Sequence, residues 1–225
     1  MGPRLSRWIL FCAVLSAGLQ LAASIRSRGL RRSALFFVLG TGLPAAGELL
    51  ATGPLGLLRH RLRYRLGGVP LAILLGWYVV IHGSYVIAGR VAERTRLGDD
   101  TKRVTVPALA VVVGVGLDLI MDPAGLDVGL WEWNVDGIYA DEVVGKNGHR
   151  GVPLLNYLGW ASLVGGVTYV YGPGGEDGAG SRLPALFLLP CYLAALGWAF
   201  KRRKFVYLLL SAPFPLTLYA AGEKG

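Results

Sequence analysis

Residues 69–88 read VPLAILLGWYVVIHGSYVIA, a stretch of 20 residues that contains no Asp, Glu, Lys or Arg. An α-helix needs about 20 mainly apolar residues to cross the roughly 30 Å hydrocarbon core of a membrane. A spanning segment is expected to be helical because that core holds no water to satisfy open backbone groups. The stretch therefore predicts a membrane-spanning helix.

Similar apolar runs recur along the whole chain. The runs lie at residues 8–24, 33–51, 69–88, 104–121, 152–171, 183–200 and 205–220. The last run is short for a span and contains two prolines. Ten-residue segments of alternating hydrophobicity, which are typical of transmembrane barrels, do not occur. The sequence predicts one all-α domain, residues 1–225, that forms a polytopic transmembrane helical bundle of about seven helices, multi-pass in the cell membrane.

The composition excludes several classes of protein. The 225 residues are 53% hydrophobic and 16% charged, whereas an average soluble domain has roughly 25% charged residues. Such a chain is neither a soluble globular domain nor disordered, and two cysteines do not make a disulfide scaffold. The net charge of +9 fits arginines that flank membrane spans, so no nucleic-acid partner is expected.

The first run and the orientation of the chain each allow two interpretations. Residues 8–24 follow Arg4 and Arg7 and end in small residues, so they fit either a signal peptide or a retained first helix. Basic residues normally mark the cytoplasmic side, but here they divide almost evenly between the two sides. We call the side that holds the N-terminus side A and leave its identity open.

An internal repeat is predicted in the middle of the chain. Residues 68–77 (GVPLAILLGW) and 151–160 (GVPLLNYLGW) are identical at seven of ten positions. Each copy is expected to open a helix with its proline in the first turn, and each follows a helix that carries an acid near its end. We interpret this as a parallel repeat of two-helix units, with chance similarity as the alternative. The units are residues 33–90 and 104–171, followed by a C-terminal helical pair at 183–220.

Carboxylates are expected to gather just inside side A. The repeat places Glu48 and Asp118 at similar depth, Asp122 shares a helix face with Asp118, and Asn156 starts the fifth helix on the same side. A carboxylate within a span costs roughly 2.5–3.5 kcal/mol to insert and faces protein or water. Glu48 and Asp118 are therefore candidate proton donors. Alternatively, each pairs with a loop arginine or caps a backbone end, and Asp122-Pro123 only stops a helix.

Aromatic side chains are expected around these acids. Trp131 and Trp133 would share one side of an extended strand in the 122–150 loop, which also carries Tyr139. Paired indoles are often interfacial anchors, but they can also line a pocket and stabilise a cation. Tyr64 and Trp160 are weaker candidates of the same kind.

No metal or nucleotide site is predicted. His60, His82 and His149 are scattered without metal-ligand spacing, and phosphate-binding glycine motifs are missing from the sequence. The alternating arginines of residues 59–65 are interpreted as a solvated stretch that faces lipid headgroups. Membrane lipid is therefore an expected partner.

A set of short motifs runs through both predicted units. It comprises Pro44-Ala-Ala-Gly-Glu48 with Thr52-Gly53, Gly68-Val-Pro70 with Trp77, Asp118-Leu-Ile-Met-Asp-Pro123, Trp131-Glu-Trp133, and Gly151-Val-Pro-Leu-Leu-Asn156 with Gly159-Trp160. Together the motifs resemble the membrane carotenoid-biosynthesis hydratases, which include CruF-type carotenoid 1,2-hydratases and archaeal bisanhydrobacterioruberin hydratases. The resemblance covers residues 33–171, and the insertion at 136–150 is closer to the archaeal branch.

The resemblance implies a cofactor-independent hydro-lyase that adds water to the terminal double bond of an acyclic carotenoid. Asp118 or Glu48 would be the acid, Asp122 the base that positions water, and Asn156 an orienting group. Expected partners are a long carotenoid within the bilayer and other membrane enzymes of the carotenoid pathway. From the residues alone, a small membrane transporter or another isoprenoid-lipid-modifying membrane enzyme stays open.

Overall fold

The computed structural model describes residues 2–172, 186–212, 214 and 215. Its helices are α1 (Pro3–Arg28), α2 (Leu30–Thr52), α3 (Leu71–Arg94), α4 (Asp99–Val128), α5 (Leu154–Tyr171), α7 (Leu189–Lys201) and α8 (Val206–Leu210). Its strands are β1 (Leu58–His60), β2 (Arg65–Leu66), β3 (Val69–Pro70), β4 (Trp131–Trp133), β5 (Tyr139–Val144) and β6 (Arg150–Val152). The predicted all-α membrane bundle is confirmed, with the strands as small additions at one end.

Within the described residues, four helices are long and apolar enough to cross a membrane: α1, α2, α3 and α4. They have 23 to 30 residues, against the roughly 20 that a span requires. Helix α5 coincides with the fifth predicted run and has 18 residues. The sixth and seventh runs lie partly outside the described residues, so their spanning character stays a prediction.

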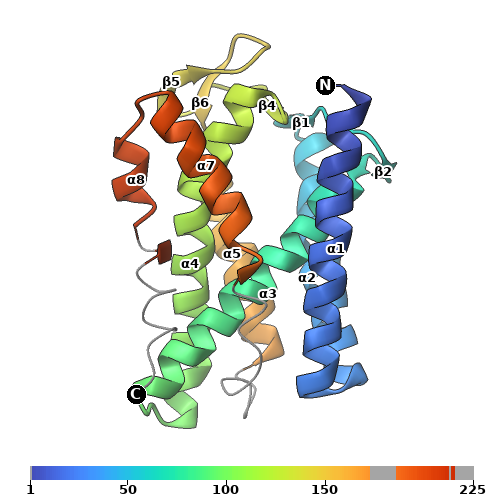
Figure 1. The fold of residues 1–225 in the computed structure, drawn as a ribbon, viewed down its shortest axis with the longest axis vertical. Helices are drawn as coiled ribbons and strands as arrows, with labels where there is room; N and C mark the ends of the chain where they lie inside the picture. The colour runs from blue at the N-terminus through green and yellow to red at the C-terminus, as the bar shows by residue number, and fades with distance from the viewer. Residues whose placement is uncertain (1, 173–185, 213, 216–225) are drawn as a thin grey trace.

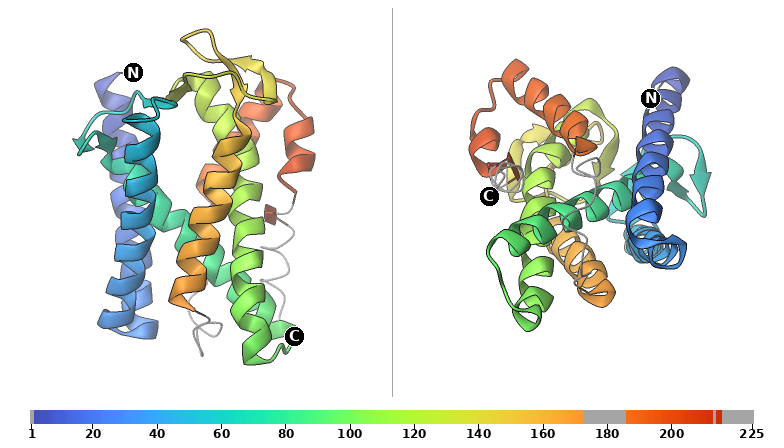
Figure 2. Two further views of the ribbon diagram at one scale, coloured as in Figure 1. Left: turned by 180° about the vertical axis from the view of Figure 1, so that it is seen from behind. Right: turned by 60° about the horizontal axis from the view of Figure 1, so that its bottom comes forward.

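The helices run up and down between two ends of the molecule, and the strands lie at the end that holds the N-terminus, side A (Figure 1). Helices α1 and α2 form one group, and α4, α5 and α7 form another (Figure 2). Helix α3 crosses diagonally between the groups and packs on α1, α2 and α4. Much of α3 is buried on all sides, because its apolar residues contact protein in both directions.

The side A loops of the two predicted units pair with each other. Strand β1 is antiparallel to β4, with Leu58 opposite Trp133 and His60 opposite Trp131. The strand pairs β2–β3 and β5–β6 lead directly into α3 and α5. Pro70 and Pro153 adopt extended backbone and cap these two helices. The prolines therefore stand immediately before the helices, not in their first turn as expected.

Helix α4 is longer than the sequence predicts. It was expected to end at Met121, but it continues through Pro123 to Val128. Gly129 then ends it in the left-handed region, with φ 75° and ψ 42°, which glycine adopts without steric cost. Asp122 is consequently a helix residue, and the alternative interpretation, that Asp122-Pro123 only stops the helix, is wrong.

The C-terminal helices are tied to α4 and β5 by polar contacts. The Trp198 indole N–H donates to Asp127 at 2.8 Å. Lys204 Nζ donates to Glu142 at 3.1 Å, and the Tyr207 hydroxyl donates to the same carboxylate. Partial burial opposes ionisation of Glu142, but the hydrogen bonds from Tyr207 and Lys204 outweigh it and lower the pKa of this carboxyl.

Candidate functional site

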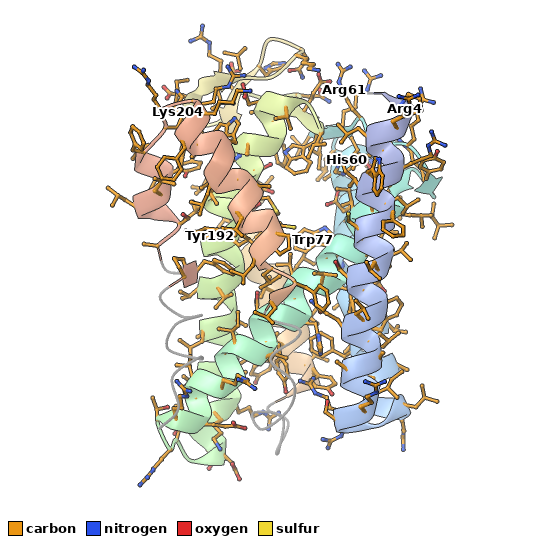
Figure 3. The ribbon with its side chains drawn as sticks, viewed as in Figure 1. Arg4, His60, Arg61, Trp77, Tyr192 and Lys204 are labelled. Carbon is orange, nitrogen blue, oxygen red and sulfur yellow. The ribbon has the colours of Figure 1, made fainter. Side chains whose placement is uncertain are left out.

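Glu48 is buried near the side A end of α2 and accepts two hydrogen bonds. His60 Nε2 lies 2.7 Å from Glu48 Oε2, and the Trp77 indole N–H donates to Oε1 at 2.9 Å. His60 comes from β1 and is 4% exposed. Figure 3 shows His60 near the side A end and Trp77 closer to the middle of the bundle. Three elements therefore converge on one carboxylate.

A second carboxylate group lies on α4. Asp118 and Asp122 are 1% and 3% exposed, and their i, i+4 spacing puts them on one helix face. Asn156 Nδ2, from the first turns of α5, donates to Oδ2 of both at 2.8 Å. An amide nitrogen carries two N–H groups, so one side chain can bridge the pair.

The two groups meet in one cluster. The rings of Trp77 and Trp160 lie against each other at a tilt, with centroids 4.2 Å apart and an interplanar angle of 37°. Trp77 donates to Glu48, and Trp160 lies one helical turn after Asn156 on α5, so this ring contact joins the two groups. We call Glu48, His60, Asp118, Asp122 and Asn156 the carboxylate cluster.

The tryptophans of β4 cover Asp122. Trp131 lies directly on Gly125 of α4, where a Cβ atom would overlap the indole ring. The indole N–H groups of Trp131 and Trp133 lie beside the Asp122 carboxyl but fall short of hydrogen-bond geometry. Trp133 is buried and Trp131 half-buried. Two electron-rich rings therefore border the carboxylates inside the side A loops.

Tyr139 compensates for the proline within α4. Pro123 lacks the N–H that would bond to the Leu119 carbonyl, four residues earlier. The Tyr139 hydroxyl donates to this carbonyl at 2.7 Å. Burial, followed by the charges of Asp118 and other nearby carboxylates, raises the pKa of Tyr139, so it remains a neutral donor. Its ring also packs edge-on against Tyr157 at 5.3 Å.

The predicted site residues are thus mostly brought together. Glu48, Asp118, Asp122, Asn156, Trp131, Trp133, Tyr139 and Trp160 all lie in or against the carboxylate cluster. Tyr64 does not join them. It occupies the turn between β1 and β2 with φ 58° and is 43% exposed.

Sequence reasoning missed His60 and misread part of the 59–65 stretch. Arg59 and Arg63 are exposed as expected, but His60 and Leu62 are buried. Arg61 NH2 lies 2.6 Å from Glu132 Oε1, and Glu132 is 1% exposed. The alternation of Leu58, His60 and Leu62 with arginines has the period of a half-buried strand. That periodicity was the available signal for an inward-facing His60.

Within the described part of the chain, no three His, Cys, Asp or Glu side chains are grouped as metal ligands. The arrangement instead offers an imidazole in contact with one carboxyl and an amide in contact with two others. Such a set can donate a proton, accept one and orient water.

Fold and site together define an all-α membrane protein with a buried acid–base cluster at one end of the bundle. Residues 8–173 match the family model described as carotenoid biosynthesis protein. This match covers most of the chain, so the protein belongs to that family and acts in carotenoid biosynthesis. No curated protein and no solved structure matches the chain.

Proposed function

We propose that this protein is a carotenoid hydratase that adds water to the terminal double bond of an acyclic carotenoid. The observation that carries the proposal is the pair of buried aspartates bridged by Asn156, in a membrane protein of the carotenoid biosynthesis family. A terminal dimethyl alkene needs only an acid, a water molecule and a base. The carboxylate cluster offers groups of each kind.

The reaction would proceed by acid catalysis. Protonated Asp118 transfers its proton to the less substituted alkene carbon, which leaves a tertiary carbocation on the dimethyl carbon. Water, oriented by Asp122, forms the new C–O bond and releases one proton to a base of the cluster. The product is a tertiary alcohol. Indole rings stabilise a desolvated cation by about 2 kcal/mol, and Trp131 and Trp133 border the position that we assign to it.

The contacts favour Asp118 over Glu48 as the acid. Glu48 uses both oxygens as acceptors, from His60 and Trp77, which suits an ionised carboxylate. Asp118 accepts one hydrogen bond, at Oδ2. A pair of neighbouring carboxyls is also the arrangement in which one group serves as acid while the other stays ionised.

The substrate we propose is an acyclic carotenoid such as lycopene or bisanhydrobacterioruberin. Its polyene would lie in the bilayer, while one end enters the cluster at side A, where water and acid meet. A multi-pass location in the cell membrane follows from this use. Other membrane enzymes of the carotenoid pathway are the proposed partners, because they supply and consume the same insoluble pigments.

The test is expression in a bacterium that makes lycopene and in one that makes bisanhydrobacterioruberin, followed by pigment mass spectrometry. We expect products heavier by one water for each hydrated end. A matched strain carrying Asp118→Asn controls for host enzymes. Unchanged pigments with both substrates, from protein shown to be present in the membrane, would overturn the proposal. A different modification, such as cyclisation, would indicate another isoprenoid-modifying activity.

A further inference from the structure

We infer that His60 is the base of the site: it takes the proton that the attacking water releases, and Glu48 holds and stabilises the resulting imidazolium. This inference rests on the hydratase function proposed above and names one further residue for it. His60 belongs to the antiparallel pair formed by β1 and β4.

The β1–β4 pair turns four side chains toward the ends of α2 and α4. Opposite residues of an antiparallel pair project from the same face, so His60 lies on the face of Trp131, and Leu58 on that of Trp133. The contact of His60 with Glu48 identifies this as the inner face. His60 therefore touches Glu48 and lies opposite Trp131, whose indole lies beside Asp122.

The two ring nitrogens of His60 have different surroundings. Nε2 is held by Glu48 at 2.7 Å, and as the donor to this carboxylate it carries the proton. Nδ1 then presents a lone pair, and this atom is buried without a hydrogen bond to any described protein group. An imidazole whose one nitrogen is fixed by a carboxylate and whose other nitrogen is free is arranged as a general base.

Other buried polar atoms lie on the inner face of the β1–β4 pair. The Trp131 and Trp133 indole nitrogens are also buried and lack partners in hydrogen-bond geometry. Together with His60 Nδ1 they provide two donors and one acceptor, and a bound water typically satisfies about three such groups. The inner face of the β1–β4 pair therefore offers a water position bordered by a base, by Asp122 and by the indole rings.

The proton balance closes within the cluster. The Asp118 O–H bond breaks as the C–H bond of the product forms. One water O–H bond breaks as the C–O bond forms, and its proton adds to His60 Nδ1. The imidazolium lies against the Glu48 carboxylate and then returns its proton to Asp118. Among the described residues, the charged groups in contact with His60 are Glu48 on α2, at Nε2, and the Arg65 guanidinium, which donates to the His60 carbonyl.

The test compares His60→Gln with His149→Gln in membranes supplied with the acyclic carotenoid over a range of pH. The Gln amide N–H can replace the His60 donor to Glu48 but cannot act as a base. We expect turnover to fall by about 10²–10⁴-fold in His60→Gln, together with a changed dependence of the rate on pH. His149 is an exposed histidine of the β5–β6 hairpin, so its variant should match wild type.

The outcomes separate the two proposals. If wild type hydrates and His60→Gln hydrates equally well, or keeps the same pH profile at a reduced rate, His60 is not the base although the hydratase function stands. If wild type fails to hydrate, both fall. A readout independent of turnover is ¹⁵N NMR of labelled histidine, with the His60 signal identified by its loss in His60→Gln. The inference predicts a neutral ring protonated at Nε2, and protonation at Nδ1 instead would contradict it.

Discussion

The two predicted repeat units share one order of elements but carry different polar groups. In the first, α2, β1, β2, β3 and α3 follow one another. In the second, α4, β4, β5, β6 and α5 follow in the same sense. Trp77 and Trp160, which are equivalent in the repeat, lie against each other. The equivalent of Asn156 is Ile73, so the first unit has no amide bridge at that position.

This difference indicates how one scaffold can hold two halves of a reaction. The first unit surrounds a single carboxylate with an imidazole and an indole, which suits an ionised group beside a base. The second unit brings two carboxyls to one amide, which suits proton donation. The duplication itself stays a prediction, and the contact between Trp77 and Trp160 links the carboxyl groups of the two units.

The largest effect is expected from Asp118→Asn. The amide preserves shape but cannot donate the catalytic proton, so we expect the hydration rate to fall by about 10²–10⁴-fold. The melting temperature should change by only a few degrees. Rate and melting are measured on protein purified in detergent. If Asp118→Asn keeps the full rate, Asp118 is not the acid, and Glu48 of the first unit becomes the candidate.

Asn156→Ile copies the residue of the first unit into the second. It removes both bridging hydrogen bonds and leaves two buried carboxyls short of a donor, at a cost of about 1–3 kcal/mol for each unsatisfied group. We expect a clear loss of thermal stability together with reduced turnover. The reciprocal variant Ile73→Asn is the control, and an equal effect of both would argue against a special role for the bridge.

A smaller effect is expected from changing Trp77 or Trp160, the paired tryptophans of the two units. Trp77→Phe keeps an aromatic ring but removes the N–H donor to Glu48, which should cost about 1–3 kcal/mol because a buried acceptor loses this partner. Trp160→Phe keeps an aromatic ring against Trp77 and leaves the Trp77 indole donor in place, so it should cost less free energy of unfolding. Denaturation of the two purified variants measures the difference. A larger loss from Trp160→Phe would contradict the assigned contact.

The smallest effect is expected in the β5–β6 hairpin of the second unit, which is longer than the β2–β3 hairpin of the first. The Arg150 backbone N–H and then His149 donate to Asp136 and lower the pKa of this carboxyl. Because the folded pKa is lowered, this stabilisation is complete above the ordinary aspartate pKa of about 3.9 and is lost as pH falls through the folded value. Hydrogen exchange should show faster opening of residues 137–152 in Asp136→Asn than in wild type at pH 6.

The same exchange experiment includes its own control. At a pH below the folded value, wild type and Asp136→Asn should open at equal rates. The β2–β3 hairpin of the first unit contains no acid and should not respond to the variant. A difference that persists at low pH would mean that Asp136 acts by a route other than its charge.

The fold could be predicted because span length and composition are local properties. The grouping of Glu48, Asp118 and Asn156 could be predicted because a repeat fixes which helix ends share a side. The extent of α4 could not, since the Leu119 carbonyl that Pro123 leaves without a helix donor is satisfied by Tyr139, which lies 20 residues further along the chain. His60 was missed because its arginine neighbours suggested a solvated stretch, although Leu58, His60 and Leu62, at alternate positions, are buried.

The central claim, that water is added across a terminal alkene by the carboxylate cluster, is tested most directly with isotopically labelled water. Membranes containing the wild-type protein are incubated with acyclic carotenoid in H₂¹⁸O under ordinary oxygen, and the pigments are analysed by mass spectrometry. We predict that each new hydroxyl carries ¹⁸O and that Asp118→Asn forms almost none. Product hydroxyls without ¹⁸O, or no hydroxylated product from active membranes, would contradict the account.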